Sequence, residues 1–172
     1  MKLQRDITRK YVKGSDIPWY KIYPFFLIHM LVFGVSGFLL AYGFNSQLHF
    51  HLRYFVYAHG GLAILTYTAF YLAIFGRDEV KWMIINAGLG SLAIYSQIGL
   101  LLSLAGKNAS DYPFNVHVIP FIYYVLYTFL VRQAVLDITQ SREDPIKKKR
   151  VENLFIAFSV AVCAISYFAR IQ

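Results

Sequence analysis

Charged residues are scarce in this sequence. Asp, Glu, Lys and Arg make up 15% of its 172 residues, while 58% are hydrophobic. A soluble domain is about one quarter charged and about half apolar. A single cysteine, Cys163, excludes an intramolecular disulfide and the paired-cysteine patterns of zinc and redox sites. A water-soluble protein is therefore not the expected class.

The apolar stretches also lack acidic residues and lysines at their centres, because all nine acidic residues fall in loops or near stretch ends. Pumps normally need an ionisable residue inside the membrane. Secondary transporters usually show paired repeats and broken helices, and the sequence indicates neither. The motifs of serine hydrolases, zinc proteases, P-loop proteins and dinucleotide-binding proteins are missing too. We expect neither transport nor hydrolysis.

What the sequence does contain is a series of apolar runs of about the length, some 20 residues, that crosses a bilayer. There are five of them, at about residues 23–44, 54–75, 82–105, 116–136 and 154–169. Residues 1–22 precede them as a basic arm with mixed aromatic and apolar residues. We therefore expect an all-α, polytopic membrane protein, with an arm at 1–22 and a five-helix transmembrane domain at 23–172.

The positive charges predict how this bundle is oriented. Fourteen Lys and Arg residues fall in residues 1–22, 77–81 and 132–150, and only three fall on the other side of the predicted membrane. Short loops rich in Lys and Arg stay in the cytoplasm. The formal charge of +8 thus indicates membrane topology rather than a nucleic-acid partner. The N-terminus is expected inside and the C-terminus outside, which fits a prokaryotic inner membrane.

Four of the five histidines gather on the predicted outer side. His49 and His51 lie in the first outer loop, and His59 lies about one and a half turns into the second span. His117 lies near the outer start of the fourth span. Because the second and fourth spans run in the same direction, His59 and His117 are expected at similar depths. His29, in the first span, is expected to be an interfacial residue hydrogen-bonded to a neighbouring residue or to a partner subunit.

Two imidazoles from two helices are what a bis-histidine haem b requires, and the glycines Gly60 and Gly61 would let the ring approach the backbone. The first hypothesis is therefore a membrane subunit of a redox complex that holds haem b, or borders a quinone site, through His59 and His117. This rests on an analogy of architecture alone, since no motif identifies a family.

Two other interpretations of the histidines stay open. A copper or zinc site at the outer surface could use His49 and His51, together with His59, His117 or Asp111, because imidazole suits either metal. Alternatively the histidines are interfacial polar groups, and the chain is a non-catalytic structural or assembly subunit of a larger complex. The redox-subunit and the non-catalytic-subunit hypotheses both imply other membrane-protein subunits as partners, and lipids are expected as well.

Small residues predict where the helices pack closely, since membrane helices associate through close contact. Asn86 and Gln97 would be costly in contact with lipid and are expected to face neighbouring helices. The expected packing positions lie in the first and third spans and are Gly34, Gly37 and Ala41, then Gly88, Ser91, Gly99 and Ser103.

Overall fold

The computed structural model describes residues 2–43 and 50–169, and this part of the chain is helical without strands, as the sequence predicts. Only a single β-bridge, between Lys2 and Asp16, occurs there. The elements, in chain order, are α1 (Trp19–Phe38), the π-helix η1 (Leu39–Gly43), α2 (Phe50–Ile74), α3 (Arg77–Leu89), α4 (Ser91–Leu104), the 3-10 helix η2 (Ala109–Asp111), α5 (Phe114–Ile138) and α6 (Pro145–Ala169).

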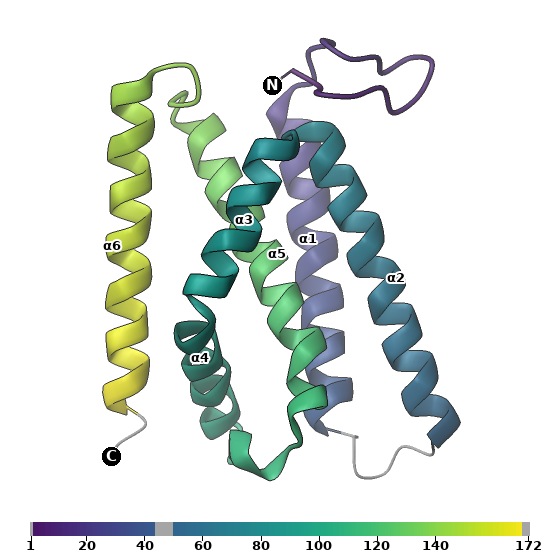
Figure 1. Ribbon diagram of the computed structural model, residues 1–172, viewed down its shortest axis with the longest axis vertical. Helices are drawn as coiled ribbons and strands as arrows, with labels where there is room; N and C mark the ends of the chain where they lie inside the picture. Colours follow the sequence, from purple (N-terminus) through teal and green to yellow (C-terminus); the bar gives the residue numbers. More distant parts are fainter. Residues whose placement is uncertain (1, 44–49, 170–172) are drawn as a thin grey trace.

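Helices α1 and α6 and the bent pair α3–α4 run one way along a single bundle, and α2 and α5 run the other way (Figure 1). Helix α5 crosses the middle and packs most extensively on α1, while α2 lies on one side of it. Helix α6 lies on the other side and packs mainly on α4. The start of α1 and the end of α6 therefore lie at opposite ends of the bundle.

Three helical segments are long and apolar enough to cross a membrane: Trp19–Gly43, Phe114–Ile138 and Pro145–Phe168. The pair α3 and α4 makes a fourth if it is one broken span. In α2, the apolar stretch identified among the described residues is Gly60–Ile74, which is shorter than a span. This composition fits a membrane protein, whereas the count of five spans and their direction stay predictions.

The helix over the predicted span at 82–105 is broken rather than continuous, because α3 and α4 meet at an angle of 69°. The break lies at Gly90, which has φ −90° and ψ 8° and whose N–H donates to the Asn86 carbonyl over 2.8 Å. Gly88, Gly90 and Ser91 follow one another closely, and such Gly and Ser clusters favour kinks. The sequence indicated no broken helix, and the break between α3 and α4 corrects that expectation.

The N-terminal arm folds back onto the bundle. Leu3 is buried in the core, and the backbone N–H groups of Gln4 and Arg5 donate to the Ala73 carbonyl over 2.9 and 3.2 Å. The last carbonyls of a helix have no partner within the helix. The arm therefore caps α2, and the chain turns directly afterwards at Gly76, where φ is +89°.

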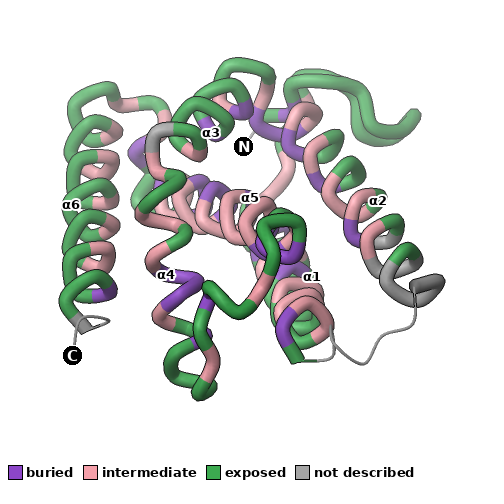
Figure 2. The backbone as a smooth tube through the Cα atoms, turned by 60° about the horizontal axis from the view of Figure 1, so that its bottom comes forward, coloured by how far each residue is buried: buried purple, intermediate pink, exposed green. Residues whose placement is uncertain are grey.

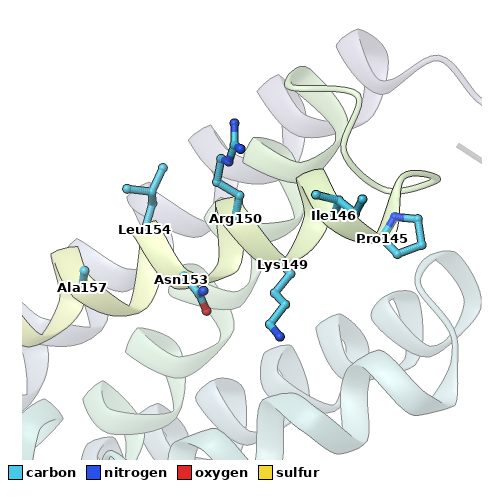
Figure 3. A pocket seen from close by; sticks show the side chains of 7 residues that line it. All are labelled: Pro145, Ile146, Lys149, Arg150, Asn153, Leu154 and Ala157. Atoms are coloured by element: carbon cyan, nitrogen blue, oxygen red, sulfur yellow. The ribbon is translucent and has the colours of Figure 1, made fainter.

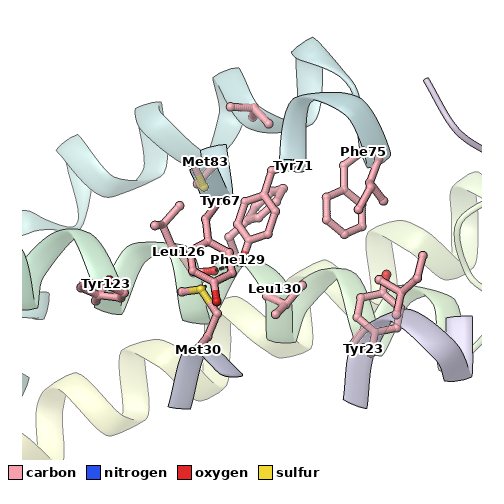
Figure 4. Close-up of a cluster of buried hydrophobic side chains, with 14 of the residues drawn as sticks. Tyr23, Met30, Tyr67, Tyr71, Phe75, Met83, Tyr123, Leu126, Phe129 and Leu130 are labelled. Atoms are coloured by element: carbon pink, nitrogen blue, oxygen red, sulfur yellow. Dashed lines mark hydrogen bonds between the residues drawn. The ribbon is translucent and has the colours of Figure 1, made fainter. Parts of the chain in front are cut away.

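Aromatic side chains fill the larger core, which lies among α1, α2, α3 and α5 (Figure 4). The backbone positions that are buried are marked in Figure 2. The Phe129 ring centroid lies 5.2 Å from that of Tyr71 and 5.5 Å from that of Phe75. The buried Tyr71 hydroxyl donates to the Leu126 carbonyl over 3.1 Å. A smaller core around Tyr42 lies at the end of the bundle where α5 begins.

Several predicted small-residue seams are not points of close approach. A Cβ added to Gly34, Gly37 or Gly88 would meet no atom within 4 Å. At Gly60, by contrast, an added Cβ would lie 3.1 Å from Cδ1 of Ile119. At this point α2 and α5 approach each other closely.

Candidate functional site

His117 lies in the first turn of α5 and is buried, with 5% of its surface exposed. Its Nδ1 lies 2.8 Å from the Tyr42 hydroxyl, and its Nε2 lies 3.2 Å from the Ala109 carbonyl oxygen. Because a carbonyl only accepts, Nε2 carries the proton, and Nδ1 accepts from Tyr42. Both ring nitrogens of His117 are therefore satisfied within the chain.

Tyr42 connects this histidine to the loop before α5. It lies in the π-helix that ends the first helical segment, where carbonyls lack partners within the helix. Its carbonyl accepts from the ammonium group of Lys107 over 2.5 Å and from the hydroxyl of Tyr112 over 2.8 Å. One residue thus fixes α5 through its side chain and the loop before α5 through its backbone.

The two predicted haem ligands belong to helices that begin at the same end of the bundle, α2 and α5 (Figure 1). The side chain of His59 lies outside the described part of the chain. Of the two glycines predicted to admit a haem ring, Gly60 faces the side chain of Ile119, and Gly61 has open space beside it. Haem ligation by His59 and His117 stays a prediction.

The predicted copper or zinc site falls largely outside what the structure describes. His49 lies outside the described residues, as does the side chain of His51. Asp111 is exposed, and its carboxylate accepts the Asn108 N–H over 3.3 Å in a capping box. Among the described residues, no group of three His, Cys, Asp or Glu side chains could hold a metal ion.

His29 lies on α1 and is exposed. Its Nδ1 is hydrogen-bonded to the hydroxyl of Tyr67 on α2. Its ring centroid lies 5.7 Å from that of Phe25, with the rings stacked, and 4.5 Å from that of Phe33. The predicted bond to a neighbour is confirmed. At about 1.5 Å per residue, His29 lies about 15 Å along the helix from Trp19.

A network of charges joins three helices at the end of the bundle where α1 begins. The carboxylate of Glu79 on α3 accepts from Arg132 over 2.9 Å, from Gln133 over 2.8 Å and from Lys148 over 3.0 Å. Arg132 also pairs with Glu152 on α6. Glu79 thus links α3 to α5 and, through Lys148, to α6.

A second cluster lies beside it and fixes the loop between α5 and α6. Arg142 donates to the two carboxylate oxygens of Asp137 over 2.6 and 3.0 Å and to the side-chain oxygen of Gln133 over 2.8 Å. Tyr23 of α1 also donates to Asp137. Burial lowers the pKa of Arg142, but the hydrogen bond and charge of Asp137 outweigh it and raise this pKa, so the guanidinium stays charged.

Sequence reasoning missed this charge network among α3, α5 and α6. Its available signal was that Glu79, Arg132 and Glu152 all fall near the predicted inner ends of spans, where opposite charges at one depth can pair. For the polar residues inside spans, the outcome is mixed. Gln97 is buried and hydrogen-bonded to Tyr124, as predicted. Asn86 is exposed, so the prediction that it faces a neighbouring helix is wrong.

No protein-family model matches this chain, and comparison with curated proteins and with solved structures found no match either. Its function is therefore inferred from its own residues.

Proposed function

We propose that the chain is a non-catalytic integral-membrane subunit that packs beside another membrane protein through the outer face of α1. It crosses the membrane five times, with its N-terminal arm inside and its C-terminus outside. The observation that carries this proposal is the position of His29, a polar ring about 15 Å along α1 that is exposed on the outside of the bundle.

The outer face of α1 is a continuous apolar stripe, with exposed side chains repeating every three or four residues. Such a stripe suits lipid as well as protein, so it does not discriminate between them. The stripe consists of Phe25, Ile28, Val32 and Val35 on α1 and continues at Leu39, the first residue of η1.

His29, beside this stripe, distinguishes a protein partner from lipid. Within the described part of the chain, hydrogen bonding to His29 involves only Nδ1. A polar group left unpaired in hydrocarbon is costly, and polar residues at such depth usually face protein. A partner helix that offers a hydrogen-bonding group to Nε2 satisfies His29 and covers the stripe at the same time.

The distribution of charge supports the proposed orientation and a prokaryotic inner membrane. The arm, the turn between α2 and α3 and the segment between α5 and α6 lie at one end of the bundle (Figure 1). Fourteen of the seventeen Lys and Arg residues lie in these segments or on the helix ends beside them, within residues 1–22, 77–81 and 132–150. Positive loops stay in the cytoplasm.

A haem b or quinone site near the outer face is the competing proposal. The shared starting end of α2 and α5 supports it. A haem iron, however, needs a free ring nitrogen, so His117 would have to release Tyr42 or Ala109. The contact of Ile119 with Gly60 would also have to open. The described geometry therefore favours the non-catalytic role.

Site-specific photocrosslinking in membranes of the source organism tests the proposal. A photoreactive residue at Val32, on the α1 stripe, is expected to give one discrete adduct with a different membrane protein. The matched control is Val160, which is equally exposed but lies on α6. His29→Leu is expected to weaken the adduct. No adduct at Val32, or an adduct only of twice the mass of the chain, contradicts the proposal.

A further inference from the structure

The outer face of α6 carries a shallow, open groove close to the start of the helix (Figure 3). Its lining residues repeat every three or four positions and so share one side of α6. That side is opposite the one that carries Lys148, Glu152 and Ser166, which face the bundle. The groove is lined by Ile146, Lys149, Arg150, Asn153, Leu154 and Ala157, next to Pro145.

The groove is positively charged without internal compensation. Of the basic run at 147–150, Lys148 turns inward to Glu79, at 3.0 Å. Lys149 and Arg150 are exposed, and neither forms a salt bridge within the described part of the chain. The amide of Asn153 lies one turn further along the same side. Two cations and an amide group are complementary to a phosphate.

The part of the groove further along α6, beyond Arg150, is apolar. Leu154 follows Arg150 by four residues, or about 6 Å along the helix, and Ala157 continues the same side. Beyond it, Val160, Ala161 and Ala164 are also exposed. The cations thus lie at the boundary where the apolar part of α6 begins, and a smooth apolar track leads away from them.

We propose that this groove binds an anionic phospholipid. Lys149 and Arg150 hold the phosphate of the headgroup, Asn153 donates a further hydrogen bond, and an acyl chain lies along Leu154 and Ala157. A free phosphate would contact only the charged and polar part of the groove, at Lys149, Arg150 and Asn153. The proposal rests on one part of the proposed function, namely that the start of α6 lies at the inner face of the membrane. It does not depend on the contact between α1 and a partner.

Native mass spectrometry of the full chain in detergent micelles tests this proposal, with phosphatidylglycerol and phosphatidylcholine as probes. The unchanged protein is expected to bind phosphatidylglycerol in preference. The double variant Lys149→Gln with Arg150→Gln is expected to weaken this binding at least about tenfold, because each cation near anionic lipid contributes to attraction. The matched control is Arg9→Gln with Lys10→Gln, which removes the same charge from exposed positions on the arm.

Several results overturn the proposal. Equal loss in the two double variants shows general charge attraction, and equal binding of the two lipids shows that the headgroup charge is not recognised. Competition by millimolar inorganic phosphate shows a simple anion site. Because these variants leave α1 unchanged, crosslinking at Val32 stays a separate measure, and failure of either proposal is recognised independently.

Discussion

The hydroxyl of Tyr42 and Nδ1 of His117 lie 2.8 Å apart, although 75 positions separate the two residues in sequence. This hydrogen bond joins the π-helix after α1 to the first turn of α5, and both residues are buried. His117, which the sequence suggests as a cofactor ligand, thereby helps to hold the helices together at one end of the bundle.

Removing the Tyr42 hydroxyl should destabilise the fold. Tyr42→Phe leaves Nδ1 of His117 without a donor in a buried site, which is expected to cost about 1–3 kcal/mol. Thermal unfolding of the purified protein in detergent measures the effect. Tyr20→Phe, at an exposed position, is the control and should change little. Equal stability of Tyr42→Phe and the unchanged protein would contradict this role.

Glu79 should matter more for stability than other acidic residues at the same end of the bundle. Glu79→Gln removes the charge that Arg132 and Lys148 share, and because these side chains are partly exposed we expect a loss of about 2 kcal/mol rather than the larger cost of a fully buried pair. Glu143→Gln, which removes an exposed carboxylate nearby, is the control. If the two variants unfold at the same temperature, the network does not hold the helices together.

Gly88, just before the α3–α4 junction, and Gly90, at the junction, should respond to substitution in opposite directions. Gly88→Ala is in a helix with open space around it and should stabilise by about 0.5–1 kcal/mol. Gly90→Ala would place its Cβ 3.1 Å from the carbonyl oxygen of Asn86, so it should destabilise. Thermal unfolding of the two variants checks this prediction, and a gain in stability for both would show that Gly90 does not set the break.

Gly60 and Gly61 provide a similar comparison between α2 and α5. Gly61→Ala has open space and should stabilise the helix, whereas Gly60→Ala would place its Cβ 3.1 Å from Cδ1 of Ile119 and should be the less stable of the two. Ile119→Val removes that atom, so it should relieve part of the difference in a double-mutant cycle. Additive effects of the two substitutions would rule out direct contact.

Apolar runs predicted the all-helical fold well, because uninterrupted hydropathy is a local property of the chain. They did not predict that α6 begins at Pro145, nine residues before the predicted span, since the charged residues there form helix as readily as apolar ones. The break at Gly90 was also missed, because hydropathy does not change there. Hydropathy reflects amino-acid composition, whereas a kink depends on the conformational preferences of the backbone, so hydropathy alone does not predict it.

The candidate site was predicted less completely. The sequence identified His117 and placed it near the start of its helix, but its partners Tyr42 and Ala109 are set by how η1 and η2 pack against α5. The pairing of Glu79 with Lys148 likewise depends on which side of α6 faces the bundle. Such contacts arise from tertiary packing and leave no fixed spacing in the sequence.

The most direct test of the non-catalytic role is the reduced-minus-oxidised absorption spectrum of the full chain, purified from its native membrane. We expect a folded protein without Soret or alpha bands, and folded His117→Ala protein should be equally colourless. A haem spectrum that disappears in both His59→Ala and His117→Ala would contradict the proposal and establish the redox alternative.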